Sequence, residues 1–235
     1  LKISEVPLLM VTHDHSDHYG GNEGVFNTAR VQRVLFSGSA SWDLEAEMDF
    51  LERIEDPPPV ERAEPGQLLA YDEDRYPVSI HVVAAAAHHS NPNDNSLAAL
   101  FNVAPANGGP SADGSATPGP DLAGSAGEGG LTLLTTGDLE ETVTDSLVRR
   151  QVMPADVDVL KVAHHGAKNG GTALLRHARP AVALIGVGAD NSYGHPAPVI
   201  AETLEEVGAV TYRTDIHGTV VLTQENARLE VAKVP

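Results

Sequence analysis

Short apolar segments recur along this chain, and in its second half they alternate with segments of helical periodicity. A short apolar run between turn signals is typical of a buried strand, whereas apolar residues three and four positions apart are typical of a helix. The pattern therefore predicts an α/β fold with sheets sandwiched between helices. The predicted strands cover residues 6–11, 31–38, 79–87, 96–103, 131–138, 157–165, 181–188, 210–215, 219–224 and 227–234. The predicted helices cover residues 41–55, 141–150, 172–179 and 197–209.

The size and composition of the chain favour a folded core. Its 235 residues fit one large domain or two small ones, and a hydrophobic fraction of 41% is too high for a disordered chain. One segment, at about residues 105–130, is rich in Gly, Pro, Ala and Ser and cannot form a core. We predict that it is a flexible surface insertion between two strands.

Charge and cysteine content exclude several kinds of site. With no Cys, the chain has no disulfide, thiolate zinc site, iron–sulfur cluster or cysteine nucleophile. The net charge of −18 opposes broad electrostatic contact with duplex DNA or an anionic membrane, although bound cations can invert the local field. No apolar run approaches the roughly 20 residues that span a bilayer, so we expect the chain itself to be soluble. The 11 His residues direct attention to metal binding.

The strongest chemical signal directly follows the first predicted strand, in the sequence HDHSDH at residues 13–18. Imidazoles and carboxylates are the ligands of zinc, manganese and iron sites. In a loop at a strand end, His13 and His15 can bind one ion while Asp17 and His18 turn toward a second. The alternative is a solvated polar loop.

Further candidate ligands follow three later strands. Asp138 comes at the end of LLTTGD, where a carboxylate can bridge two ions, and the alternative is an ordinary turn. His164 and His165 follow VDVLKVA, and His195 lies in GHP after a further strand. In α/β folds, ligand-binding residues gather at the carboxyl ends of strands, which favours one shared rim. For His195, an ordinary loop position is an equal alternative.

The remaining His residues give weaker signals. His89 or Asp94 could complete the shell of the first metal, although a His in a loop is more often only solvated. His81 is expected to be a plain strand residue and His177 a structural or exposed helix residue, while His217 lies in a turn that could approach the site.

These residues together carry a family likeness. The segments THDHSDHYGG, NDNSLAAL, LLTTGDLE, VDVLKVAHHGAKNGG, VGADNSYGHPAP and YRTDIHGTVVL resemble the C-terminal metallo-β-lactamase-like domain of ComEC-type DNA-internalisation competence proteins. The resemblance implies a single αββα sandwich over residues 1–235. Because the family domain begins with strands that precede the first motif, we expect this chain to lack them. The third His motif of the metallo-β-lactamase superfamily also has no clear match, since NDNSL stands in that region.

The resemblance also implies a metal-dependent hydrolase, a phosphodiesterase or nuclease acting on DNA during uptake. The implied cofactors are two divalent ions, zinc or manganese. The implied partners are DNA, single-stranded by expectation, and the membrane channel portion of the same parent protein, so that this domain faces outside the cytoplasm. The resemblance implies as metal ligands His13, His15, Asp17, His18, Asp138 and one of His164 and His165. We keep both His164 and His165 as candidate ligands and, by our extension, add His89. The expected catalytic residues are Asp17, Asp138 and His195, the last as an acid or a phosphate contact.

Two rival functions stay open at this point. The first is a small-molecule phosphodiesterase or esterase that uses the same metals. The second is a non-catalytic domain with a degenerate metal site that guides DNA. A nucleic-acid strand needs cations or aromatic rings along its path. Tyr193 could be a stacking group, whereas Trp42 is more typical of a core. The basic residues nearest the motifs are Arg149, Arg150, Lys161, Lys168, Arg176, Arg179 and Arg213.

Overall fold

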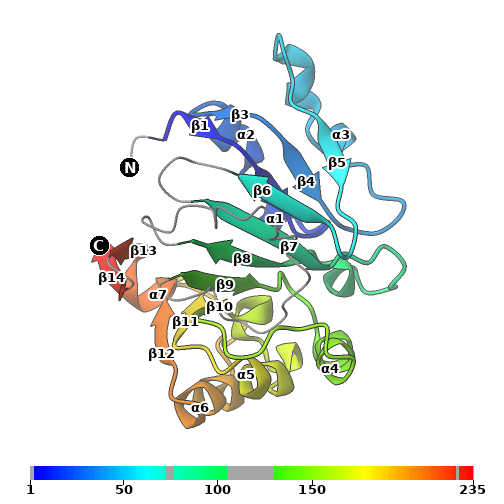
Figure 1. Ribbon diagram of the computed structural model, residues 1–235. Coiled ribbons are helices and arrows are strands. Elements are labelled where there is room, and N and C mark those ends of the chain that lie inside the picture. Colours follow the sequence, from blue (N-terminus) through cyan, green and yellow to red (C-terminus); the bar gives the residue numbers. More distant parts are fainter. Residues whose placement is uncertain (1–2, 72–76, 105–129, 226–227, 235) are drawn as a thin grey trace, which may run out of the picture.

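Two β-sheets form the centre of the structure (Figure 1). The computed structural model describes residues 3–71, 77–104, 130–225 and 228–234. The larger sheet has seven strands in the order β12-β11-β10-β9-β8-β7-β6; β9 to β12 are parallel, and β6 to β9 pair antiparallel. Its strands are β6 (Leu68–Tyr71), β7 (Val78–Ala84), β8 (Ala98–Val103), β9 (Leu131–Thr135), β10 (Val159–Lys161), β11 (Val182–Ile185) and β12 (Val210–Arg213).

The smaller sheet has three parallel strands in the order β2-β4-β5, namely β2 (Leu9–Val11), β4 (Val34–Phe36) and β5 (Val60–Arg62). Two strand pairs stand beside the sheets. They are the parallel pair β1 (Glu5–Val6) with β3 (Arg30–Val31) and the antiparallel pair β13 (Thr219–Glu225) with β14 (Arg228–Val234).

Helices lie on the two outer sides of this pair of sheets (Figure 1). Those beside the larger sheet are α4 (Glu141–Arg149), α5 (Ala173–Ala178) and α6 (Pro198–Glu206). The N-terminal helices are α1 (Ser16–Tyr19), α2 (Asn22–Phe26) and α3 (Leu44–Glu47), and α7 (Thr214–His217) follows β12. Short 3-10 turns cover Asp49–Arg53, Pro92–Asn95, Ala163–Gly166 and Lys168–Gly170. Among the described residues, none of the helices has the length and apolar character needed to cross a membrane.

Three buried apolar clusters separate the four layers. The alternation of side chains along a strand shows this directly, since Val34 and Phe36 pack toward α3 while Leu35 packs toward the other sheet. In β8, Leu100 packs toward α4, α5 and α6, whereas Ala99 faces the smaller sheet. The order of layers is therefore helix, sheet, sheet, helix, as the resemblance implied.

The local predictions were wrong in several places. The predicted strands 6–11 and 31–38 are each divided into two short strands, and α1 and α2 were not predicted. Residues 41–55 do not form one helix, because α3 ends at Met48 (φ −109°, ψ 44°) and a 3-10 turn follows. A regular helix would have directed Phe50 away from the face of Leu44 and Met48, and the break brings it into the same core. The strands β5 and β6 were not predicted, and the turn at residues 215–218 largely belongs to α7. The segment predicted as a flexible insertion, about 105–130, lies outside the described residues except for Gly130.

Candidate metal centre

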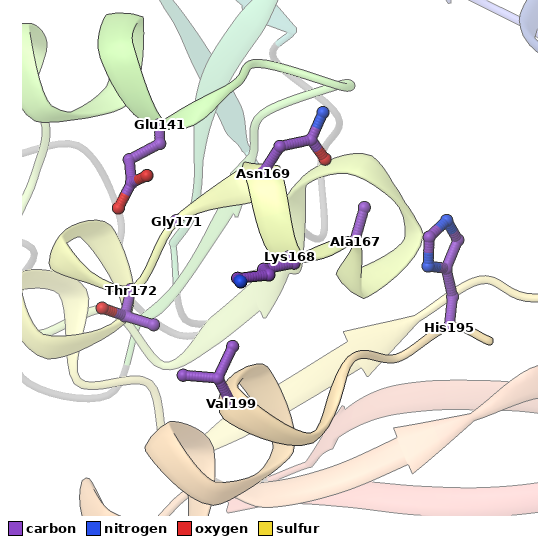
Figure 2. Close-up of a pocket in the computed structure, with 8 residues that line it drawn as sticks. All are labelled: Glu141, Ala167, Lys168, Asn169, Gly171, Thr172, His195 and Val199. Atoms are coloured by element: carbon purple, nitrogen blue, oxygen red, sulfur yellow. The ribbon is translucent and has the colours of Figure 1, made fainter. Parts of the chain in front are cut away.

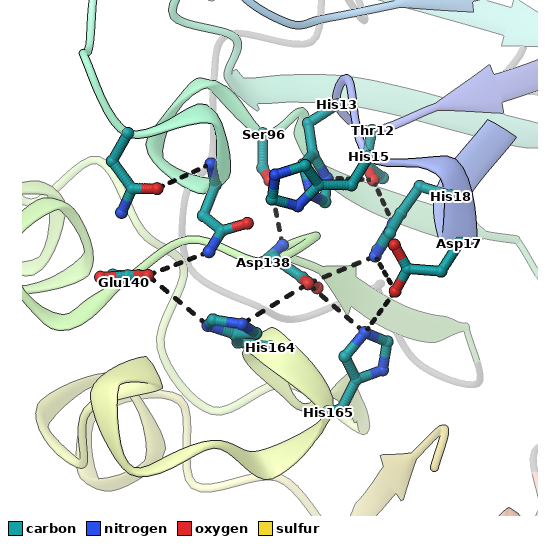
Figure 3. A network of polar contacts seen from close by, with 12 residues as sticks. Thr12, His13, His15, Asp17, His18, Ser96, Asp138, Glu140, His164 and His165 are labelled. Atoms are coloured by element: carbon teal, nitrogen blue, oxygen red, sulfur yellow. Dashed lines mark hydrogen bonds and ion pairs between the residues drawn. The ribbon is translucent and has the colours of Figure 1, made fainter. Parts of the chain in front are cut away.

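The candidate ligands lie where strands of both sheets end (Figure 3). His13 follows β2, and the short helix α1 then carries Asp17 and His18. Asp138 follows β9, and His164 and His165 follow the parallel strand β10. Because each strand is anchored by apolar residues, its end delivers a polar side chain to the same rim.

Asp138 is the common neighbour of three imidazoles. Its Oδ2 lies 3.3 Å from His18 Nε2, 3.4 Å from His165 Nε2 and 3.9 Å from His164 Nε2. The side chain is 3% exposed, and the backbone N–H donates to Ser96 Oγ over 3.0 Å. The structure thus buries one carboxylate among three imidazoles that come from two separate segments.

The other candidate metal-ligand atoms of residues 13–18 also lie close to imidazole nitrogens of this cluster. His13 Nε2 lies 3.1 Å from His15 Nδ1, and Asp17 Oδ2 lies 3.4 Å from His165 Nε2 and 3.7 Å from His18 Nε2. Two ligands on one tetrahedral zinc ion stand about 3.3 Å apart, given bonds of about 2.0–2.1 Å. These spacings are therefore those of atoms that share a cation. Two groups among the described residues could hold one, His13 with His18 and Asp138, and Asp17 with His18 and His165.

Unsatisfied buried atoms support the fit to a metal. Within the described part of the chain, His18 Nε2, His165 Nε2 and Asp138 Oδ1 are buried and form no hydrogen bond. A buried polar atom without a partner costs about 1–3 kcal/mol, and a divalent cation would remove that cost. The donor set of nitrogen and oxygen atoms suits zinc or manganese.

Hydrogen bonds at the back of two rings fix their orientation. His165 Nδ1 lies 2.8 Å from the carbonyl oxygen of Gly186, and His18 Nδ1 lies 2.8 Å from Thr12 Oγ1. When Nδ1 carries the proton and donates, Nε2 keeps its lone pair for the centre. This is the arrangement that metal-binding His residues require.

Burial and neighbouring charges set the protonation of the site. Burial, followed by the nearby His18, lowers the pKa of His13 to about 4. Burial alone would raise the pKa of Asp138, but the adjacent imidazoles of His165 and His18 hold it well below its ordinary value. The adjacent Asp138 carboxylate raises the pKa of His165 against the opposing effect of burial. Near neutral pH, His13 is therefore neutral and Asp138 is charged, which are the forms that bind metal.

Glu140 is a site residue that the sequence analysis did not identify. Its Oε1 lies 3.8 Å from His164 Nδ1 and accepts a 3.0 Å hydrogen bond from Asn93 Nδ2. Its backbone N–H donates to Asp94 Oδ1 over 3.1 Å, so Asp94 supports Glu140 rather than joining either ligand group. The second acid in LLTTGDLE, two residues after Asp138, was the available signal.

His89 is not brought to the cluster. Its backbone N–H donates to Asn95 Oδ1, its ring lies 4.4 Å from that of His88, and neither ligand group within the described residues includes it. Within the NDNSL segment, Ser96 contributes to the site because its Oγ accepts a hydrogen bond from the Asp138 backbone N–H. Asn95 instead holds the His89 backbone.

His195 lies next to the cluster without joining a ligand group. Its ring is 6.3 Å from that of His164, and burial, followed by His164 and His165, lowers its pKa. Other His residues have separate places. His177 Nε2 lies 3.0 Å from the carbonyl oxygen of Met153, and His217 Nδ1 accepts from Arg213 N–H. His81 lies in β7, between the neighbouring strands β6 and β8.

The comparisons with known proteins agree with the motifs. No protein-family model matches the chain. The chain is 24% identical over 226 residues to ComE operon protein 3 of Bacillus subtilis (strain 168), covering 95% of this chain and 25% of that protein. It is 32% identical over 91 residues to Competence protein ComA of Neisseria gonorrhoeae, covering 38% of this chain and 13% of that protein. The chain thus spans about a quarter or less of the curated relatives that it matches.

One solved structure covers nearly the whole chain. It is the metallo-β-lactamase fold protein YhfI of Bacillus subtilis, with 10% identity, a TM-score of 0.42 and coverage of 97% of this chain and 78% of that one. The relation to the competence proteins, at modest identity over most of the chain, confirms the resemblance drawn from the motifs. The four-layer mixed α/β fold is the metallo-β-lactamase-like fold expected.

Proposed function

We propose that this chain is a metal-dependent phosphodiesterase that cleaves DNA, single-stranded by preference, during competence-related uptake. The observation that carries the proposal is the buried Asp138, which three imidazoles from two segments surround at one rim of the sandwich. Folding alone gives no reason to bury three polar atoms of this cluster without hydrogen-bond partners, namely His18 Nε2, His165 Nε2 and Asp138 Oδ1. Such a constellation is the chemistry of a cation site.

The proposed ligands of two divalent ions are His13, His15, Asp17, His18, Asp138, His164 and His165. When bound, such ions lower the pKa of a water molecule and offset the charge that grows on a phosphoryl group. Asp138, whose Oδ2 lies 3.3 Å from His18 Nε2 and 3.4 Å from His165 Nε2, is the proposed shared ligand. Asp17, with a side chain 62% exposed, holds its carboxylate at the solvent side where a substrate enters.

His195 is the proposed substrate-facing residue. Its ring stands beside His164 and outside both ligand groups, so its nitrogens are not committed to a cation. Either it gives a proton to the departing sugar oxygen, or it donates a hydrogen bond to a phosphoryl oxygen.

The biological setting is inferred from the relatives. Similarity to Competence protein ComA and ComE operon protein 3 supports a place in DNA uptake. Because the chain spans about a quarter of the latter, we propose that it is a domain of a larger membrane protein. In this proposal it lies on the extracytoplasmic face of the membrane and works beside the channel portion of the same parent protein.

A small-molecule phosphodiesterase is the second candidate, and the charge distribution favours it. The net charge is −18, and four of the seven basic residues near the motifs already face carboxylates, Arg149, Arg176, Arg179 and Arg213. A short diester would need only the metal site, whereas a long strand needs further cationic or aromatic contacts.

The test is metal analysis combined with hydrolysis of bis(p-nitrophenyl) phosphate and of labelled single-stranded DNA in Mn²⁺ and in Zn²⁺. We expect bound metal and cleavage of both substrates, with loss of both activities in His15→Ala and in Asp138→Asn. His88→Ala is the matched control, because this exposed imidazole lies outside the ligand groups. Undiminished hydrolysis in both site variants contradicts the assignment. Cleavage of the small diester alone favours the second candidate, and less than one equivalent of metal favours a non-catalytic domain.

A further inference from the structure

Tyr193 presents an aromatic ring to solvent beside the candidate metal centre. Its relative exposure is 83%, although large rings are normally covered in a folded chain. One face of the ring stacks on His195, with the centroids 5.7 Å apart and the planes 13° from parallel. The half-buried ring of Trp42, by contrast, packs against Phe36 and Tyr19 at the edge of the core. The surface therefore offers one flat ring, supported from behind by a site residue.

Hydrogen bonds hold the loop that carries Tyr193 in a fixed conformation. Asn191 Oδ1 accepts the His195 N–H over 2.9 Å, and Asn191 Nδ2 donates to the carbonyl oxygens of Gly188 and His195. At the base of the loop, Thr214 Oγ1 makes two 2.7 Å hydrogen bonds to the backbone of Val187. A ring that is exposed on a braced loop loses little entropy when it contacts a ligand.

His195 also lines a cavity. Its volume is about 510 Å³, and Figure 2 shows Lys168, Thr172 and Glu141 around it, with His195 to one side. Lys168 forms no ion pair with the described residues, unlike Arg176, Arg179 and Arg213, whose partners are Glu206, Asp156 and Asp215. The cavity thus holds an exposed cation that is not neutralised by a salt bridge.

We propose that Tyr193 and this cavity form the subsite for a nucleotide next to the phosphodiester that is cut, in a single-stranded nucleic acid. A nucleobase stacks on the open face of Tyr193, and the adjoining phosphate passes His195 to Lys168. The proposal rests on the proposed function, because it places the scissile phosphate at the metal centre.

The two contacts differ in strength. Stacking of a base on an aromatic side chain strengthens binding by about 5- to 150-fold, whereas an exposed ion contact strengthens it by about fivefold or less. The carboxylate of Glu141 lines the same cavity and opposes a phosphate there. Tyr193 therefore carries the larger part of the affinity, and the subsite distinguishes strands with bases from strands without them.

The test measures binding rather than turnover. The full chain is loaded with Mn²⁺ and titrated by fluorescence anisotropy with a phosphorothioate-linked dodecathymidylate, and with an abasic strand of the same length and linkage. We expect the wild-type chain to bind the thymidylate about tenfold more tightly than the abasic strand, and Tyr193→Ala to bind both about equally. Tyr193→Phe keeps the ring and is expected to keep the preference. Ile216→Ala, which shortens another exposed apolar side chain away from the cavity lining, is the control.

The proposal is overturned if the wild-type chain does not prefer the thymidylate, or if Tyr193→Ala keeps the preference. Loss of the preference in Ile216→Ala as well also overturns it, because the effect would then not belong to Tyr193. Hydrolysis of bis(p-nitrophenyl) phosphate by the wild-type chain tests the proposed function separately, since that diester has no nucleobase. If the chain hydrolyses the diester but shows no base-dependent binding, only the proposed subsite is contradicted. If it shows base-dependent binding but no hydrolysis, only the proposed phosphodiesterase activity is contradicted.

Discussion

Two His-His pairs occur in this chain, and they differ in their position relative to the candidate metal centre. Both follow an apolar strand of the larger sheet, His88-His89 after β7 and His164-His165 after β10, and these two strands run in the same direction. Both pairs therefore leave the sheet at the same edge. Only His165 belongs to a group of the described residues that could hold a metal, although His164 also faces Asp138.

The backbone beyond each strand decides the difference. His164 and His165 adopt positive φ angles of 48° and 54° in a tight turn, and the His164 N–H donates to the carbonyl oxygen of Gly137. Such angles cost about 1 kcal/mol or more and are found at functional sites. The segment after β7 is instead tied toward the smaller sheet, because the carbonyl oxygens of Ala86 and Ala87 accept from Ser37 and Ala40. An identical dipeptide thus faces the candidate metal centre only where the turn directs it there.

The largest expected effect comes from removing one imidazole of each pair. His165→Ala removes a ring that contacts both Asp138 and Asp17, so we expect metal-dependent hydrolysis to fall by about 1000-fold, which corresponds to about 4 kcal/mol of lost metal assistance. His89→Ala is expected to change hydrolysis by less than about twofold. Initial rates with bis(p-nitrophenyl) phosphate at fixed Mn²⁺ measure both. Equal losses in the two variants would contradict the distinction between the pairs.

A second prediction concerns the turn itself. Gly166 follows the His164-His165 pair with φ +78°, and a Cβ there would stand 2.7 Å from Pro196 Cβ. We expect Gly166→Ala to lower the free energy of unfolding by about 2–3 kcal/mol, through the strained φ and the clash together. Ser90→Ala changes the exposed residue that follows the other pair, and we expect less than about 0.5 kcal/mol. Urea unfolding followed by circular dichroism measures both, and a tolerated Gly166→Ala would show that the tight turn is not required.

The fold could be predicted to the level of its layers. Apolar periodicity located the strands that bury both faces, such as β4 and β8, because a strand that is buried on both faces appears in the sequence as a run of apolar residues. It missed β5, whose three residues are all half-buried and two of them charged, and β6, whose four residues alternate between exposed and half-buried with none fully buried. It also joined α3 to the following 3-10 turn, since the sequence does not show that Phe50 needs a break at Met48 to reach the core.

The candidate site could be predicted as a set of motifs but not as a set of contacts. The segment 13–18, Asp138 and His165 were each recognised from their place after a strand, and the structure brings them together. His89 has the same sequence signal, yet hydrogen bonds with Ser37, Ala40 and Asn95 direct its segment elsewhere. Glu140 was missed for the opposite reason, because its partners His164 and Asn93 are distant in sequence and only tertiary packing makes it a neighbour.

Glu140 gives the smallest expected effect and the finest test of how His164 differs from His89. The carboxylate stands behind His164 Nδ1 and is held by Asn93, whereas the only side-chain hydrogen bonds made to His89 within the described residues reach its backbone. A carboxylate behind a metal-binding imidazole fixes the ring and strengthens it as a ligand, and its loss typically costs 10- to 100-fold in metal affinity. We expect Glu140→Gln to weaken Mn²⁺ binding by about tenfold, measured by isothermal titration. Glu141→Gln, which neutralises the adjacent exposed carboxylate without touching His164, is the control and should leave the Mn²⁺ affinity within about twofold. If both variants weaken binding equally, the effect is one of net charge, and Glu140 does not position His164.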